Sequence, residues 1–478
     1  MNTVGGFVIL YLVISVGIGL YAATKVNNTG DYAVAGRSLP LPVVIATVFA
    51  TWFGSETVLG VPGEFVAHGL GGVIEDPFGA SMCLVLVGLF FARKLYKLKL
   101  LTIADYYRYR YNRVVEVIVS ICILLSYLGW VAAQITALGM VAEILSGGAI
   151  PLHMGMVLGA AIVLTYTLFG GMWSVALTDS FQMVLIVAGL LFIAYFMSDM
   201  AGGAETIITH ASEAGKLDMR PEFTLAGILA FIGAAVTLML GSIPQQDVFQ
   251  RVMSSKSANV AMYGAVIGGT LYLLFAFIPM FITYAAHLID PDMVARNLEA
   301  DTAGHILPTL IMERAPQMAQ ILFFGALLSA IMSTASATLL APSITVVENL
   351  LGQFMKMDDR QQLLATRITV FIFTIAVTSY AWIMEGTSIY ELVGNAYKVT
   401  LVGAFIPLVM GLYWSRATTQ GALFSTIGGL ASWILMEAFG ADSIWPPQLV
   451  GLLVSFFGMI IGSLLPSLAG KTPKAVTE

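Results

Sequence analysis

Apolar segments of about 20 residues recur from one end of this 478-residue chain to the other. A segment of that length spans the hydrocarbon core of a bilayer as a helix, because only helices and closed barrels satisfy their backbone hydrogen bonds there. The composition agrees: 10% of the residues are charged, against about 25% in a soluble domain. We therefore expect an all-α polytopic membrane protein surrounded by a lipid bilayer.

Hydropathy indicates about thirteen transmembrane helices. An odd number places the two termini on opposite sides of the membrane. The expected spans cover approximately residues 3–24, 40–66, 72–93, 114–145, 152–169, 175–198, 224–250, 258–288, 317–349, 364–384, 388–413, 418–438 and 446–468.

Basic residues are divided unequally between the two sides. The loop 93–113 holds seven Lys and Arg, and 17 of the chain's 22 fall on its side, against four on the other. Because cytoplasmic loops carry the excess of positive charge, we expect the N-terminus outside and the C-terminus in the cytoplasm. The membrane that we expect is a bacterial cytoplasmic membrane.

Several classes of function find no support in the sequence. The net charge is −6, and no basic tract suggests a nucleic-acid partner. We find no phosphate loop, metal cluster or nucleophile–base pattern, so we do not expect an enzyme. Cys83 and Cys122 lie in apolar stretches without metal-ligand spacing. The pattern indicates no oligomeric state.

Two spans are interrupted in the same way. Gly and Pro residues break up the spans 40–66 and 224–250, and paired interruptions of this kind indicate an inverted-repeat transporter, although both residues are frequent in membrane helices. We expect a five-plus-five inverted-repeat core with broken first and sixth core helices. The expected parts are a first helix and loop (1–39), a first repeat (40–200), an outer loop (201–223), a second repeat (224–413) and two C-terminal helices with a short tail (414–478).

Hydroxyl side chains gather in the apolar segment 325–340. They are Ser329, Ser333, Thr334, Ser336 and Thr338. Such residues are common where membrane helices pack, and this interpretation stays open. Ala330, Ser333 and Thr334 are spaced i, i+3 and i+4 and so share one helix face. Their oxygens also suit a hard cation such as sodium.

Four segments occur in the order found in one transporter family. They are GDYAVAGRSLP (30–40), YTLFGGMWSVALTDSFQ (166–182), Gln250-Arg251 with Lys256-Ser257, and 330–340. Together they resemble the sodium/solute symporter family. The resemblance implies symport by alternating access, with Na+ as the coupling ion and the only metal expected.

The resemblance also implies sodium ligands. A principal site between the first and eighth core helices would take the carbonyls of Ala50, Phe53 and Ala330 and the hydroxyls of Ser333 and Thr334. A second site, present in some members, would use Asp179, Ser333 and Ser336. Ala337 stands where that pattern has a further hydroxyl, so the second site is incomplete.

Thr51-Trp52, Gly60-x-x-Gly63-Glu64, 88–93, 130–133 and 243–251 resemble the choline-transporter branch of the family. Aromatic faces hold a quaternary ammonium by cation–π contacts, and Trp52 and Trp130 match two tryptophans of that branch's cage. Gln245 replaces the third, which argues against choline itself.

The expected solute is therefore a small nitrogenous compound, an amino acid or an amine. Glu56 would pair with its amine, and glutamine side chains would hydrogen-bond its other polar groups. The predicted substrate residues are Trp52, Ser55, Glu56, Trp130, Gln245 and Gln246. Packing of the tryptophans and a structural role for Glu56 remain alternatives.

Three charged residues are gating or weaker site candidates: Asp247, Arg251 and Lys398. Asp247 can contact an amine or pair with Arg251, four residues on, at a cytoplasmic gate. Lys398 can contact an anion or neutralise a buried acid. A different class of function also fits the chain, namely a transporter-like membrane sensor of such a solute that signals to a separate partner.

Overall fold

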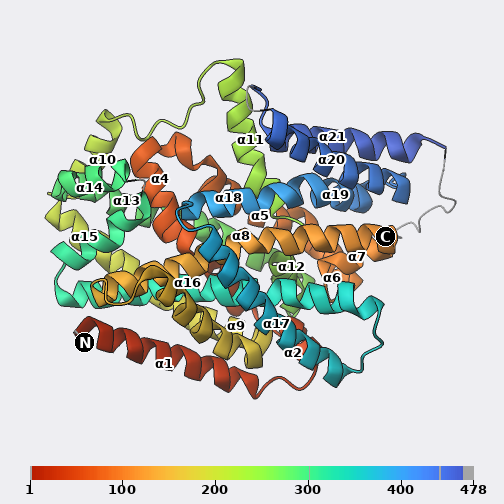
Figure 1. Ribbon diagram of the computed structural model, residues 1–478, viewed down its shortest axis with the longest axis horizontal. Helices are drawn as coiled ribbons and strands as arrows, with labels where there is room; N and C mark the ends of the chain where they lie inside the picture. The colour runs from red at the N-terminus through yellow and green to blue at the C-terminus, as the bar shows by residue number, and fades with distance from the viewer. Residues whose placement is uncertain (1–2, 301, 441–442, 467–478) are drawn as a thin grey trace.

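The protein is helical along the whole described part of its chain. A computed structural model describes residues 3–300, 302–440 and 443–466. Within these ranges the extended pairing consists of one isolated bridge, between Leu39 and Ser255. Most helices run along the long axis of the molecule (Figure 1). The all-α prediction is confirmed, and the predicted tail beyond residue 466 lies outside the described residues.

Helices and shorter helical segments alternate along the chain, with η denoting the 3₁₀ and π segments. The first half contains α1 (Thr3–Ala23), α2 (Thr29–Val34), η1 (Ala35–Arg37), α3 (Leu41–Trp52), η2 (Glu56–Gly60), α4 (Val61–His68), η3 (Leu70–Val73), η4 (Ile74–Gly79), α5 (Ala80–Leu86), η5 (Val87–Phe91), α6 (Ala92–Leu98), α7 (Ile103–Arg110), α8 (Arg113–Ser146), α9 (Leu152–Met200) and α10 (Ala204–Glu213). The second half contains α11 (Leu225–Gly241), α12 (Gln246–Ser254), α13 (Ala258–Ile289), α14 (Pro291–Glu299), η6 (Ala303–His305), α15 (Ile306–Arg314), α16 (Gln317–Thr345), η7 (Val346–Leu350), η8 (Leu351–Gln353), α17 (Asp359–Ile383), α18 (Ile389–Thr400), η9 (Leu401–Phe405), α19 (Ile406–Tyr413), α20 (Thr419–Phe439) and α21 (Pro447–Leu464).

The described residues contain ten helices long and apolar enough to span a membrane, and two further bent pairs. One of the ten, α9, has 49 residues and non-helical backbone angles at Gly171. A straight helix of that length would extend about 73 Å, more than twice the roughly 30 Å hydrocarbon core. Counting α9 as two spans gives the thirteen that the sequence predicts.

The two bent pairs are the predicted broken helices. The segments 41–52 and 56–68 meet at 57°, and α11 meets α12 at 44°. Leu39 donates a backbone hydrogen bond to Ser254 and accepts one from Lys256, each 3.0 Å long. These bonds join the start of α3 to the end of α12, so the two broken spans run in opposite directions, as an inverted repeat requires. The exact repeat boundaries stay a prediction.

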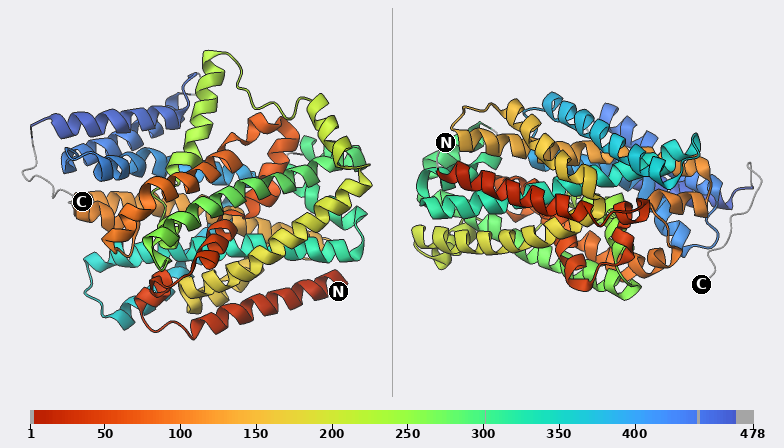
Figure 2. Two further views of the ribbon diagram at one scale, coloured as in Figure 1. Left: turned by 180° about the vertical axis from the view of Figure 1, so that it is seen from behind. Right: turned by 90° about the horizontal axis from the view of Figure 1, so that it is seen from below.

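The peripheral helices expose many large apolar side chains, and the central helix is mostly buried. In Figure 1, α1 lies along one edge, below α9, and α20 and α21 lie side by side at the opposite edge; the views in Figure 2 agree. Large apolar side chains are exposed on α1, α9, α17 and α20. The span that contains α16 is 83% buried, the largest share among the ten. The predicted hydroxyl segment therefore lies at the centre of the protein.

A glycine permits the break within α9. The Tyr32 hydroxyl donates a hydrogen bond to the carbonyl of Thr167 at 3.1 Å, just before Gly171. Gly171 has φ +50° and ψ −140°, a region that is essentially restricted to glycine. A Cβ there would lie 2.5 Å from the Tyr32 carbonyl oxygen.

Gly171→Ala should therefore destabilise the protein by more than Gly147→Ala. Gly147 has φ +62° and open space around its Cα, so its alanine variant carries only a left-handed backbone penalty of about 1–2 kcal/mol. Gly171→Ala adds overpacking of about 1–3 kcal/mol. Thermal unfolding of both variants in detergent measures the difference. Equal melting temperatures would contradict this account of the break.

Candidate functional site

The break in α3 exchanges one helical hydrogen bond for two bonds from other helices. In a continuous helix the Ser55 amide would donate to the Thr51 carbonyl. Here the Ser55 amide donates to Oε1 of Gln134 on α8 at 2.9 Å. The Thr51 carbonyl accepts from Oγ1 of Thr334 on α16 at 2.8 Å. The break thus holds its freed backbone groups without water, and it brings a hydroxyl of α16 against a main-chain oxygen of α3.

Asp179 on α9 lies beside this contact and is fully buried. Its Oδ1 accepts a 2.6 Å hydrogen bond from Ser333, and its Oδ2 accepts bonds of 2.5 Å from Thr47 and 3.4 Å from Thr51. Three hydroxyls from two helices therefore converge on one buried carboxylate. A buried charge is tolerated only when it is hydrogen-bonded or paired.

Arg251 supplies positive charge to the same region. Its Nη2 donates to the Thr51 hydroxyl at 2.7 Å, and its Nη1 donates to the Asp247 carbonyl at 2.9 Å. Thr51 therefore connects the guanidinium with the Asp179 carboxylate. The i, i+4 neighbours Asp247 and Arg251 bond through the backbone carbonyl of Asp247 and not through its carboxylate.

Most predicted sodium ligands meet at this point. Thr334 Oγ1 lies 3.5 Å from the Ala50 carbonyl oxygen as well as against Thr51. Phe53 has the non-helical angles φ −89° and ψ 66°. Ala330 is buried one turn before Ser333 on α16.

The two predicted sodium sites share Ser333, but Ser336 does not contact Asp179 in the described structure. Its hydroxyl donates to the Ser333 carbonyl of its own helix at 3.0 Å. Besides Ser333, the hydroxyls that reach Asp179 are those of Thr47 and Thr51, which the sequence did not single out as ligands. Thr51 belongs to the Thr51-Trp52 pair noted in the sequence. Thr47 lies four residues earlier, outside that pair.

An aromatic cluster surrounds Trp52. Its ring centroid lies 5.5 Å from that of Trp130 and 6.2 Å from that of Tyr397, and Trp130 lies 5.5 Å from Tyr397. Tyr127 stacks on Trp130 at 6.0 Å. The two predicted tryptophans are thus brought together, and the further aromatic rings come from Tyr397 and Tyr127, which sequence reasoning missed. Tyr397 directly precedes Lys398, the residue of this segment that the sequence predicts as a site candidate.

Glu56 is joined to this aromatic cluster by its carboxylate. Its Oε1 accepts from Nε1 of Trp130 at 3.0 Å, and its Oε2 accepts from Nε2 of Gln134 at 2.7 Å. Gln134 lies one turn after Trp130, which is the only sequence signal for its role. Ser55 is buried beside Glu56, and its hydroxyl has no hydrogen-bond partner among the described residues. A carboxylate between two N–H donors can accept further hydrogen bonds from a cation.

The remaining predicted residues separate into two groups. Gln245 donates to Ser126 at 2.8 Å, and the Asp247 carboxylate accepts from Tyr127 at 2.5 Å, so both lie beside the aromatic cluster. Gln246 instead accepts from the amide of Ile103 at 2.8 Å. Lys398 pairs with Glu437 of α20 at 3.5 Å. The structure does not bring these last two together with the other site residues.

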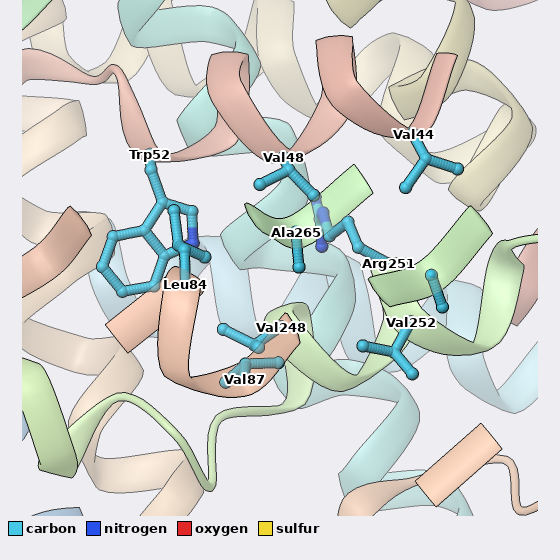
Figure 3. A pocket seen from close by; sticks show the side chains of 10 residues that line it. Val44, Val48, Trp52, Leu84, Val87, Val248, Arg251, Val252 and Ala265 are labelled. Atoms are coloured by element: carbon cyan, nitrogen blue, oxygen red, sulfur yellow. The ribbon is translucent and has the colours of Figure 1, made fainter. Parts of the chain in front are cut away.

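A small apolar cavity adjoins Trp52 on the side of α12. It measures about 10 Å³, roughly the space of one water molecule. Figure 3 shows Trp52 and Arg251 on opposite sides of it, with the side chains of Val48 and Val248 between them.

The donor set suits an alkali ion better than a transition metal. No group of three or more His, Cys, Asp or Glu in the described residues could hold a metal ion. The site instead offers carbonyl and hydroxyl oxygens with one carboxylate, which are hard ligands. Such ligands favour hard cations.

Comparison with known proteins agrees with the predicted resemblance to a sodium symporter family. A model of the sodium:solute symporter family matches residues 32–429. High affinity choline transporter 1 of Homo sapiens is 27% identical over 437 residues, which are 88% of this chain and 74% of that one. The sodium/pantothenate symporter of Haemophilus influenzae is 27% identical over 469 residues, which are 95% of this chain and 93% of that one.

Solved structures are similar over the whole fold. A Na+-coupled sialic acid symporter, in a substrate-bound outward-open state, gives a TM-score of 0.84 at 20% identity and covers 100% of both chains. Mhp1, a nucleobase-cation-symport-1 family transporter, gives 0.57 at 15% identity and covers 91% of this chain and 94% of that one. At these identities the likeness concerns the fold, and it confirms the predicted fold class.

The hydroxyls of Tyr127 and Tyr397 should differ in their effect on stability. Tyr127 donates to the Asp247 carboxylate and accepts from the Asp247 amide, whereas the buried Tyr397 hydroxyl has no partner among the described residues. Tyr127→Phe leaves buried polar groups unpaired at about 1–3 kcal/mol and should lower the melting temperature. Tyr397→Phe, the matched control, should not. Equal losses in both variants would contradict this assignment.

Proposed function

The chain belongs to the sodium:solute symporter family, and from this membership we propose that it imports a small nitrogenous solute, an amino acid or an amine, together with sodium by alternating access. The family and the relatives are transporters and not enzymes, so the chain is an integral membrane transporter of a small molecule. The observation that carries the proposed solute class is Glu56, a buried carboxylate bonded to the aromatic cluster at the break of α3.

Sodium is the coupling ion of the family, and the oxygens at the α3 break suit it. The residues that would hold it are Ala50, Phe53, Ala330, Ser333 and Thr334. A hydroxyl has one donor and two lone pairs, so Ser333 can donate to Asp179 and still offer a lone pair to the ion. Asp179 would then balance the charge of the ion through its hydrogen bond to Ser333. When bound, sodium neutralises this carboxylate and holds α16 against α3.

The solute would lie against the aromatic cluster. Its ammonium group would approach the lone pairs of Glu56 that Trp130 and Gln134 leave free, and the faces of Trp52 and Tyr397 add cation–π attraction. Gln245 and the Tyr397 hydroxyl are polar groups for the rest of the solute. Gln246 and Lys398 are not included, because Gln246 accepts a hydrogen bond from Ile103 at the start of α7 and Lys398 pairs with Glu437.

The driving force is adequate for this reaction. A unit charge that crosses about 100 mV gains about 2.3 kcal/mol, and a tenfold sodium gradient adds about 1.4 kcal/mol. One sodium ion therefore supports roughly a 500-fold gradient of a neutral solute. A cationic solute carries a charge of its own across the membrane potential and so gains about 2.3 kcal/mol more. One sodium ion therefore suffices for it.

The orientation follows from charge. Loops on the side of residues 93–113 carry most Lys and Arg, which favours a cytoplasmic location for this side. The N-terminus is then outside, the C-terminus is inside, and import runs from the α4 end of the first broken helix toward α12. The proposed location is a bacterial cytoplasmic membrane.

Sodium should raise the melting temperature of the purified protein relative to potassium at the same concentration. The double variant Ser333→Ala with Thr334→Ala should lose this stabilisation, because it removes both side-chain ligands. Thr338→Ala is the matched control, since its hydroxyl donates to the Thr334 carbonyl of its own helix at 2.7 Å. Stabilisation by sodium that survives in the double variant would refute the ion site.

A thermal-shift screen of amino acids, amines, sugars and simple carboxylates should identify the solute class. Nitrogenous solutes should stabilise the protein, and more strongly in sodium than in potassium, because the ion and the solute bind the same broken helix. Trp52→Ala should reduce the shift by removing a face of the aromatic cluster. A sodium-dependent shift from a sugar or carboxylate, with none from amines, would sink the nitrogenous-solute proposal.

A further inference from the structure

Three carboxylates line one narrow cavity beyond the aromatic cluster. Glu56 comes from η2, and Glu75 and Asp76 come from η4. Tyr390 and Gly394 of α18 also line the cavity. Leu238 and Val393 are its apolar lining residues. The cavity volume is approximately 0 Å³ in this conformation, so it does not hold a water molecule.

These carboxylates differ in how they are paired. Glu56 has its two N–H donors, and Asp76 accepts a hydrogen bond from Tyr272. No described residue donates a hydrogen bond to the side-chain carboxylate of Glu75. Lys398, the basic residue whose charge acts on Glu75, is itself paired with Glu437 at 3.5 Å.

Two buried acids, Glu56 and Asp76, and the partly buried Glu75 share one cavity and require compensation. Neighbouring carboxylates in a low dielectric cannot all be ionised unless a positive charge or protons accompany them. Burial of an unpaired ion costs several kcal/mol even after relaxation. The cluster is therefore either partly protonated or ready to accept a cation.

A second observation points to a ligand. The Tyr390 hydroxyl is buried and has no hydrogen-bond partner among the described residues. It lines the same cavity as the carboxylates. An unpartnered hydroxyl at this acidic cavity is a polar group that a bound donor could satisfy.

The spacing favours an organic cation over a metal ion. Among the described residues no three acidic, His or Cys side chains are placed to hold a metal ion. An ammonium group differs from a metal ion because its N–H donors point in several directions and reach separate acceptors. Gly394 leaves the Glu75 carboxylate uncovered, because a Cβ at residue 394 would lie 2.7 Å from Oε2 of Glu75.

We infer that Glu75 and Asp76 form, together with Glu56, a receiving site for the ammonium group of an organic amine. This inference rests on the proposed function and narrows its solute to compounds with a protonated amino group. In the proposed orientation η4 lies at the outer end of its span, so an entering amine meets Glu75 before the aromatic cluster. Glu56 lines the cavity and bonds Trp130, so it can pass the ammonium group from one site to the other.

The test uses the full-length protein and three amine probes: histamine, ethanolamine and histidine. Ethylene glycol and imidazole acetic acid lack the amino group and serve as probe controls. The melting temperature is followed against probe concentration in sodium, which gives an apparent affinity. Wild-type protein should respond to amines and not to the controls.

Glu75→Gln should weaken amine binding at least tenfold while the sodium-induced shift stays unchanged. Glu313→Gln is the matched control, because Glu313 is an exposed glutamate on the same proposed side of the membrane; its amine affinity should stay within twofold of wild type. Unchanged amine affinity in Glu75→Gln overturns this inference and leaves the proposed function standing. A wild-type protein that responds to sodium but to none of the amines overturns both.

Gly394→Ala keeps the test decisive if Glu75→Gln does not fold. It moves the Glu75 carboxylate without removing its charge, since the added methyl group meets Oε2. Amine affinity should fall severalfold in this variant, and sodium should stabilise it as it does the wild type. Affinity equal to that of wild type would count against the receiving site.

Discussion

The break of α3 between Trp52 and Glu56 is the constraint on which the rest of the site depends. It frees the Thr51 carbonyl for Thr334 and the Ser55 amide for Gln134, so α16 and α8 are bound to α3 through main-chain groups that a continuous helix would use itself. Such bonds fix the separation of the helices far better than apolar contacts do, because hydrogen bonds are directional. They also place the Thr334 hydroxyl and the Glu56 carboxylate close to the freed Thr51 carbonyl and Ser55 amide.

The buried charges of Asp179 and Arg251 are connected through a hydroxyl group and not by a direct ion pair. Asp179 and Arg251 both bond the Thr51 hydroxyl, so the two charges are connected through a group that can rotate. A direct ion pair would be difficult to open for a sodium ion, because breaking a buried pair leaves two uncompensated charges. A hydroxyl that can change its partner lowers this barrier, which suits a site that must bind and release an ion in every cycle.

How much of this was predictable depends on whether the signal is local. The spans, the two broken helices and the hydroxyl face of α16 follow from hydropathy, glycine and proline positions, and helical spacing, all of which are properties of short segments. Tyr397 and Gln134 could not be identified in this way, because their roles depend on which helices pack together. Gln245 and Gln246 are adjacent in sequence, but Gln245 has the extended backbone of the N-cap of α12 and Gln246 is its first helical residue, and only Gln245 lies beside the aromatic cluster. Glu75 and Asp76 begin a span, where an acid is usually hydrated; their burial comes from α11 and α18.

The same packing connects the ion and solute regions. The Trp52 carbonyl accepts from Thr57, Thr57 bonds the Tyr272 hydroxyl, and Tyr272 donates to Asp76. One carbonyl earlier, Thr51 accepts from Thr334 of the sodium site. A shift of this backbone segment on sodium binding would therefore reposition the acceptors of the acidic cavity. Because coupling between two binding equilibria is reciprocal, an amine that orders the acidic cavity must raise sodium affinity by the same factor. The broken helix thus provides a physical route for coupling ion and solute without any contact between them.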